Sequence, residues 1–185
     1  MLIKLKISAP LSQLFICVAL LQITASVNAQ ATPAAELQAV KTIPSIDVAR
    51  YLGTWYEIAR LDHSFERGLD KVYAEYSLRE DGGLKVVNHG YDTKKQKWNE
   101  AIGKAYFVET PDVGRLKVSF FGPFYGGYNV IALDSNYQYA LVAGENLSYL
   151  WILSRQKSIP DAVRKEYLDI AKGIGYKTEE LIWLY

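Results

Sequence analysis

Short apolar and aromatic segments separated by turn residues fill most of this 185-residue sequence. Within the segments apolar and polar residues tend to alternate, which is the period of a β-strand with two different faces. The connections are rich in the residues that end strands, and Asp81-Gly82-Gly83 is a hairpin signal. We therefore predict eight consecutive antiparallel strands, at residues 53–61, 71–79, 84–91, 98–108, 115–121, 128–134, 139–143 and 149–154.

A single helix is predicted after the eighth strand. Pro160 and Asp161 stand where the first helical turn begins, and Gly173 and Gly175 stand where the helix ends. Residues 181–185 are predicted to form a last short strand. The apolar residues that recur at helical spacing on one face are Val163, Tyr167, Ile170 and Ala171.

Eight antiparallel strands in one meander either stack as two sheets or close into a barrel. Closure removes the exposed edges, and an eight-stranded barrel has room for side chains or for one small ligand. Small and large residues occur together at the alternate strand positions that we assign to the inner face. This pattern fits a hollow interior and a packed core equally well. The small residues are Ala74, Gly103, Ala105, Ala132 and Ala140. The large ones are Tyr76, Val86, Phe107, Val118, Phe120, Tyr128, Val130, Val142 and Trp151.

The N-terminal segment has the pattern of a secretory signal. Lys4 and Lys6 precede an apolar run over residues 11–23, and Val27-Asn28-Ala29 supplies small residues for cleavage. We predict a signal peptide at residues 1–29, an N-terminal tether at 30–45 and a barrel domain at 46–185. A buried N-terminal helix is the alternative, but residues 30–45 continue no helical face.

Cys17, the single cysteine of the chain, lies inside the apolar run of the leader. Cleavage after Ala29 leaves no thiol for a disulfide, a structural zinc site or thiol catalysis. The alternative is lipidation of Cys17, although bulky Ile16 stands where a lipoprotein signal has a small residue. Loss of the two lysines of the leader changes the formal net charge from +1 to −1, which gives no indication of nucleic-acid binding.

Three motifs resemble the signatures of one known family. Residues 53–56, GTWY, resemble the Gly-x-Trp motif of lipocalins; residues 132–134 with Tyr137 resemble the second lipocalin motif; and residues 149–155, YLWILSR, resemble the third. Residues 60–69 and 118–134 resemble the bacterial branch of the family, which is related to apolipoprotein D. The resemblance implies an all-β fold: an eight-stranded up-and-down antiparallel β-barrel with a C-terminal α-helix and a short final strand.

The resemblance also implies roles for particular residues. Gly53, Trp55 and Arg155 would form the structural base, with the arginine lying across the indole ring. Residues 63–69 would form the first loop at the open mouth, where Arg67, and with it Glu66, faces water or a ligand head group. The expected ligand-binding residues of the lumen are Ala74, Tyr76, Val86, Phe107, Val118, Phe120, Tyr128, Val130, Val142 and Trp151.

The function implied by the resemblance is that of a non-enzymatic lipid-binding carrier. It would store or transport fatty acids or lysophospholipids for outer-membrane maintenance under stress, in the periplasm and in possible association with the inner leaflet of the outer membrane. We expect no cofactor and a monomer or homodimer. A filled barrel that takes up no ligand is the structural alternative.

Neither histidine is expected to serve chemistry. His63 is predicted in the mouth loop and His89 on the outer face, and no metal-ligand spacing joins them. The alternative function is that of a lipocalin that binds a tetrapyrrole or another small hydrophobic molecule. A bound tetrapyrrole would need a histidine or a similar axial ligand inside the barrel. The sequence contains no Gly-x-Ser-x-Gly elbow, the motif that would indicate a hydrolase. Residues 122–127 lack the lysine and helix of a phosphate loop and are predicted to form an aromatic hairpin.

Overall fold

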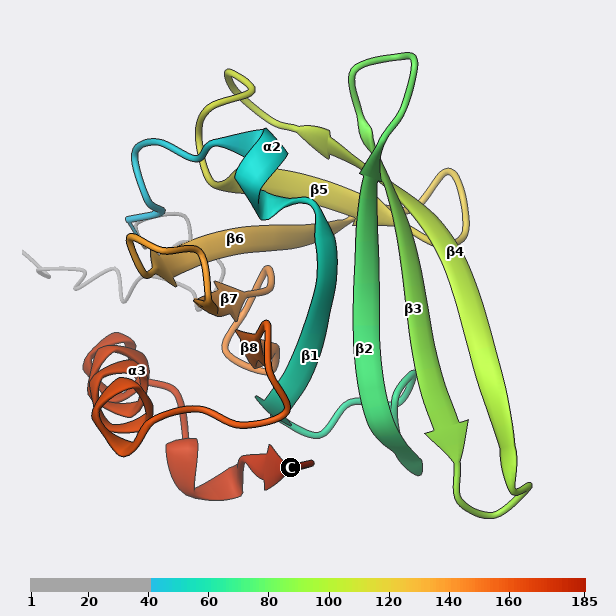
Figure 1. The fold of residues 1–185 in the computed structure, drawn as a ribbon, viewed down its shortest axis with the longest axis vertical. Helices are drawn as coiled ribbons and strands as arrows, with labels where there is room; N and C mark the ends of the chain where they lie inside the picture. Colours follow the sequence, from blue (N-terminus) through green and yellow to red (C-terminus); the bar gives the residue numbers. More distant parts are fainter. Residues whose placement is uncertain (1–40) are drawn as a thin grey trace, which may run out of the picture. The chain divides into compact units, whose positions relative to one another are not determined.

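The predicted strands form one antiparallel sheet that closes on itself in the computed structural model, which describes residues 41–185. The predicted leader, Cys17 and residues 30–40 of the predicted tether lie outside the described residues. The strand order is β2-β3-β4-β5-β6-β7-β8-β1-β9, and an additional β1–β2 pairing closes the barrel (Figure 1). The strands are β1 Gly53–Arg60, β2 Leu69–Leu78, β3 Leu84–Asp92, β4 Lys97–Phe107, β5 Arg115–Ser119, β6 Gly126–Leu133, β7 Tyr139–Ala143, β8 Leu150–Ser154 and β9 Ile182–Trp183.

The predicted eight-stranded barrel, C-terminal helix and final strand are confirmed. Helix α3, Asp161–Ile174, begins after Pro160 and is capped by Gly175 in the left-handed region at φ 107°. Gly173, predicted to help end the helix, is its next-to-last residue. A 3₁₀ turn, η1 Thr178–Glu180, then leads into β9. None of the helices in residues 41–185 is long and apolar enough to cross a membrane.

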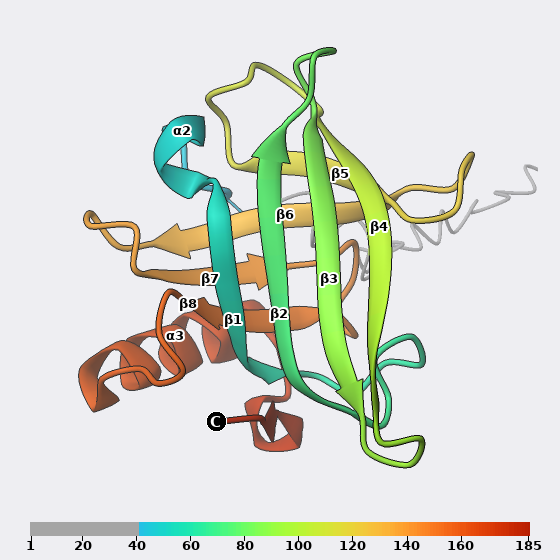
Figure 2. The same ribbon diagram turned by 45° about the vertical axis from the view of Figure 1, so that its right-hand side comes forward.

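A one-turn helix at the start of the barrel was not predicted. Helix α2, Val48–Tyr51, begins after Asp47, whose carboxylate accepts a hydrogen bond from the backbone N–H of Arg50 at 3.2 Å. That arrangement is an ordinary N-cap. Figures 1 and 2 show α2 at the end of the barrel where β1 begins and β2 ends. This end is the base of the barrel, and the opposite end is its mouth.

The base is held by an arginine over a tryptophan. The guanidinium carbon of Arg155 lies 3.9 Å from the ring centroid of Trp55, whose side chain is completely buried. The Arg155 guanidinium also donates hydrogen bonds to the carbonyl oxygens of Thr54 at 2.7 Å and Arg50 at 2.8 Å. Gly53 has φ 89°, a conformation that favours glycine, so the chain can turn into β1 without strain.

Side chains pack in two clusters, one inside the barrel and one outside it. The outer cluster lies between the barrel wall and α3, where Tyr167 and Ala171 are buried (Figure 2). The Tyr167 hydroxyl donates to the carbonyl oxygen of Tyr139 at 2.9 Å, which fixes the helix to β7. The inner cluster gathers around Trp55 at the base.

Three β-bulges change which side chains face inward. The irregularity between Val130 and Ala132 places Ala132 in the outer cluster, so our assignment of Ala132 to the inner face was wrong. A second bulge follows Glu57, which faces the lumen like Trp55 two residues earlier, and it places Ala59 in the outer cluster. A third lies between Asp70 and Tyr73 in β2. Because each bulge adds one residue to a strand, it reverses the alternation on one side of itself.

Candidate ligand-binding site

A cavity occupies the barrel between the base and the mouth. The empty space of this site, counted out into the solvent at the opening, is about 810 Å³. The wall is almost entirely apolar. Seven of the predicted lumen residues line it: Ala74, Tyr76, Val86, Val118, Phe120, Tyr128 and Trp151.

The other three predicted lumen residues lie elsewhere in the interior. Val130 and Val142 are completely buried in the inner cluster, and Phe107 packs against that cluster. None of the three is among the residues that line the cavity. The barrel is therefore filled near Trp55 and hollow above it, which combines the two alternatives that the sequence left open.

Several residues of the cavity wall were not identified from the sequence. Tyr51 comes from the unpredicted helix α2, and Glu57 lies on the same face of β1 as Trp55. Phe65 and Glu66 belong to the β1–β2 loop, residues 61–68, which bends into the mouth. Three sequence signals bear on these positions: Asp47 as the N-cap of α2, the two-residue spacing of Glu57 from Trp55, and the predicted mouth loop that contains Phe65 and Glu66.

Three tyrosine hydroxyl groups meet inside the barrel. The Tyr128 hydroxyl lies 2.7 Å from that of Tyr51 and 3.1 Å from that of Tyr76. Burial raises the pKa of Tyr76 to about 12, and the pKa values of the other two are also raised, mainly by burial. All three hydroxyl groups therefore keep their protons at physiological pH and give the otherwise apolar floor of the cavity a neutral polar group.

A second polar cluster lies under the β1–β2 loop, and it contains charged groups. Arg60 Nη1 lies 2.7 Å from Glu57 Oε1, and Arg60 Nη2 donates to the carbonyl oxygen of Glu66 at 3.0 Å. Glu66 Oε2 lies 3.0 Å from His63 Nε2 and accepts a hydrogen bond from Trp151 Nε1 at 3.2 Å. Buried charges of this kind are tolerated only when they are paired and hydrogen-bonded, so the cluster ties the loop to the wall.

Two of our predictions of surface residues in this loop were wrong. His63 and Glu66, both expected at the wet mouth, are only 5% and 6% exposed. The loop folds inward because His63 packs against the rings of Phe65 at 3.9 Å and Trp151 at 5.3 Å between centroids. Arg67 is exposed as expected, and its guanidinium lies 2.6 Å from the Asp62 carboxylate.

The comparison with known families agrees with this geometry, since the family model of the lipocalin-like domain matches residues 46–185. The chain belongs to the lipocalin family. The outer membrane lipoprotein Blc of Citrobacter freundii is 57% identical over 145 residues, 78% of this chain and 82% of the relative. Apolipoprotein D of Mus musculus is 31% identical over 146 residues, 74% of this chain and 75% of the relative.

Solved lipocalin structures share the fold at lower identity. Insecticyanin from the tobacco hornworm Manduca sexta superposes with a TM-score of 0.64 at 20% identity, covering 79% of this chain and 84% of that one. Lipocalins are generally non-enzymatic binding proteins, and this lipocalin is a carrier of a small hydrophobic ligand. The resemblance to bacterial lipocalins and to apolipoprotein D is thus confirmed.

The histidines of this lipocalin occupy different surroundings. His89 lies on the outer face, where its ring stacks on Tyr73 at 4.5 Å and its Nε2 lies 3.1 Å from Glu75 Oε2. His63 lies behind Phe65 and is not among the residues that line the cavity. Within residues 41–185, no group of three or more histidine, cysteine, aspartate or glutamate side chains is arranged to hold a metal ion.

Glu57 should make the stability of this lipocalin depend on pH. Burial, and secondly the negative charge of Glu66, raise the pKa of Glu57 well above its ordinary value, against the opposing effect of Arg60. The folded chain therefore holds the proton of the Glu57 carboxyl group more tightly than the unfolded chain does. In the unfolded chain the pKa of a glutamate is about 4.3. The contribution of Glu57 to the stability of the folded wild type must then increase as the pH is lowered from its raised pKa to about 4.3.

Glu57→Gln removes this titration, because an amide stays neutral. We expect the free energy of unfolding of Glu57→Gln, minus that of the wild type, to be largest above the raised pKa. This difference should fall by up to about 1.4 kcal/mol per pH unit as the pH is lowered from the raised pKa of Glu57 to about 4.3. Urea denaturation at a series of pH values measures the difference, and Glu80→Gln on an exposed turn is the control. A difference that stays constant with pH would contradict the assignment.

Proposed function

We propose that this lipocalin stores or transports one long-chain fatty acid or lysophospholipid for maintenance of the outer membrane under stress. The observation that carries the proposal is the cavity, whose wall is apolar apart from Glu57, Glu66, Asn88 and the tyrosine hydroxyl groups. Each methylene group moved from water into such a wall contributes about 0.8 kcal/mol before the costs of binding are subtracted. A long acyl chain therefore suffices for micromolar affinity or better.

The polar groups of the cavity suit a ligand with a single polar end. Glu57 and Glu66 line the wall toward the mouth, together with the ring of Trp151. The wall between this cluster and the tyrosine hydroxyl groups offers an acyl chain only apolar side chains and Asn88. We propose that the ligand's head group lies at the mouth and that its chain points toward Trp55.

The fluorescence of Trp151 offers a direct test of this proposal. Its indole lines the cavity and donates to Glu66, so a bound acyl chain changes both its surroundings and its hydrogen bond. We expect saturable quenching or a blue shift when a long-chain fatty acid or a lysophospholipid is titrated into the purified protein. Trp151→Phe should lose most of the signal while still taking up lipid in a displacement assay.

Two results would contradict the proposal. One is the absence of saturable binding to either lipid in both assays, as a filled or closed barrel would give. The other is a purified protein that absorbs visible light, as a bound tetrapyrrole would, and that fails to exchange its ligand for fatty acid.

We also propose a periplasmic location for this lipocalin, at the outer membrane. The proposal is supported by the printed name of the Citrobacter relative, an outer membrane lipoprotein, and by the leader pattern of residues 1–29. The intact mass of protein expressed with its own leader distinguishes the two forms of the N-terminus. Cleavage after Ala29 gives an unmodified chain that starts at Gln30, whereas lipidation gives a diacylglyceryl group on Cys17 and contradicts that cleavage.

A further inference from the structure

The most exposed large apolar side chains of the described residues lie beside the mouth. Phe121 is 81% exposed and Phe124 is 78% exposed. Both belong to the β5–β6 loop, residues 120–125, which lies between the cavity-lining residues Phe120 and Gly127. No charged residue occurs from 118 to 133 of the sequence. This loop therefore offers an uncharged aromatic tip next to the opening through which a ligand must pass.

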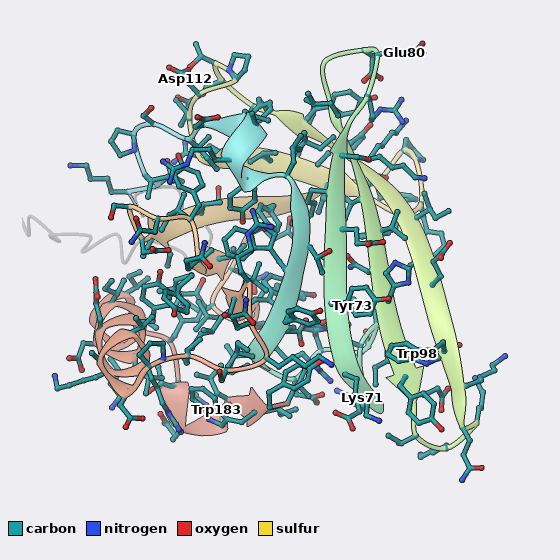
Figure 3. The ribbon with its side chains drawn as sticks, in the orientation of Figure 1. Lys71, Tyr73, Glu80, Trp98, Asp112 and Trp183 are labelled. Atoms are coloured by element: carbon teal, nitrogen blue, oxygen red, sulfur yellow. The ribbon has the colours of Figure 1, made fainter. Side chains whose placement is uncertain are left out.

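Basic and amphipathic side chains surround the same end of the barrel. Lys94, Lys95 and Lys97 are exposed at the β3–β4 hairpin. The neighbouring Trp98 is 54% exposed and packs edge-on against Tyr91. Figure 3 shows Trp98 and Lys71 together at this end of the barrel, and Lys71 Nζ lies 5.3 Å from the Tyr91 ring centroid.

The opposite end of the barrel carries charges of both signs, since Arg79 pairs with Asp81 and Arg115 pairs with Glu109. Glu80 and Asp112 stand at the far end of the view from Trp98 and Lys71 (Figure 3). Glu109 and Asp134 belong to loops at the same end, and Asp112 and Glu80 are exposed. The β2–β3 and β4–β5 turns at the base contain no lysine, so the lysine cluster of the β3–β4 hairpin is a feature of the mouth end.

We propose that the mouth end of the barrel docks on a phospholipid bilayer that contains anionic lipids. Phe121 and Phe124 enter the acyl region, Trp98 lies at the level of the head groups, and the hairpin lysines face the anionic phosphates. Exposed aromatic tips flanked by tryptophan, tyrosine and lysine are typical of proteins that bind at a membrane surface. The lysine cluster and the aromatic tip lie at the same end of the barrel, which orients the docking.

Docking in this orientation gives the cavity access to its source of ligand. Phe65 is exposed on its outer side and also lines the cavity, so the surface that meets the bilayer is continuous with the lumen wall. A lipid could then move between bilayer and barrel without crossing water. This use of the surface rests on the proposed lipid-carrier function, whereas the docking itself does not.

Sedimentation with vesicles tests the docking on the full chain carrying Cys17→Ser, which cannot form an acyl anchor. Vesicles of phosphatidylcholine containing phosphatidylglycerol are compared with vesicles of phosphatidylcholine alone. Phe121→Ser/Phe124→Ser should lower the vesicle partition coefficient about tenfold or more, because two phenyl rings no longer enter the bilayer. The matched control is Leu78→Ser/Val108→Ser, which changes two exposed apolar residues at the base and should leave the coefficient unchanged.

A second pair of variants tests the charge. Lys94→Gln/Lys97→Gln should weaken binding to the anionic vesicles about 30-fold, since each lysine near such a surface contributes about 1 kcal/mol. It should have no effect on phosphatidylcholine alone. Lys85→Gln/Lys104→Gln removes the same charge from the other halves of β3 and β4 and should bind like the parent.

The outcomes separate docking from the carrier function and from self-association. If the parent binds free fatty acid but no vesicle, docking is wrong and the carrier function stands. If the phenylalanine and control variants bind vesicles equally, the mouth is not the docking surface. If the phenylalanine variant only converts a dimer to a monomer in sedimentation velocity, a second copy of the chain occupies this surface and the proposal is overturned.

Discussion

Val118→Trp is expected to weaken the binding of a long-chain fatty acid by about 1 to 3 kcal/mol, or about 5- to 150-fold. Val118 lines the cavity from β5 and lies opposite Ala105 of β4. The larger ring would occupy space that the ligand needs. A fluorescence or displacement titration measures the loss of affinity, and the urea midpoint shows whether the variant remains folded.

The matched control for this prediction is Ile102→Trp. Ile102 lies on the neighbouring strand β4 but is exposed on the outside of the barrel. The same ring added there should leave lipid affinity unchanged. If Val118→Trp and Ile102→Trp both bind lipid as tightly as the parent, the assignment of the ligand to this part of the cavity is wrong.

Arg155→Ala is expected to lower the free energy of unfolding by about 2 to 4 kcal/mol. The change removes the cation–π contact with Trp55 and leaves the carbonyl oxygens of Thr54 and Arg50 without their guanidinium donor. Urea denaturation measures the loss. Lipid affinity of the folded fraction should stay nearly the same, because Arg155 is not among the residues that line the cavity.

Two further variants show which property of Arg155 matters. Arg155→Lys keeps the charge but cannot reproduce the planar fork that reaches two carbonyl oxygens while lying on the indole, so it should recover only part of the loss. Arg67→Ala removes an exposed guanidinium paired with Asp62 and should have little effect. An Arg155→Ala variant as stable as the parent would show that the base does not depend on this contact.

The order of strands could be predicted from the sequence because each strand is half buried and so alternates in polarity. The turn residues between strands gave the connections, and the three motifs around Trp55 and Arg155 indicated closure into a barrel. The bulges could not be predicted, since they depend on pairing with neighbouring strands. Ala132 was placed on the wrong face for this reason. Glu57 keeps the regular alternation from Trp55, yet it was not recognised as part of the lumen wall.

The cavity wall was predicted in part. Alternation in β2, β3 and β5 identified residues such as Ala74, Val86 and Val118, which face inward along regular strands. It could not show how far the base is filled, and Val130 and Val142 lie in that filled part. The chain's loops were the least predictable element, because the inward fold of the β1–β2 loop depends on a buried cluster whose members are joined only in three dimensions.

Native mass spectrometry of the purified protein, followed by extraction of any bound lipid, tests the carrier function most directly. We predict one lipid per folded chain, either co-purified or taken up from added ligand, and its mass should be that of a fatty acid or a lysophospholipid. The same spectrum reports whether the chain is a monomer or a homodimer. A folded protein that keeps only its own mass after both lipids have been offered would contradict the account.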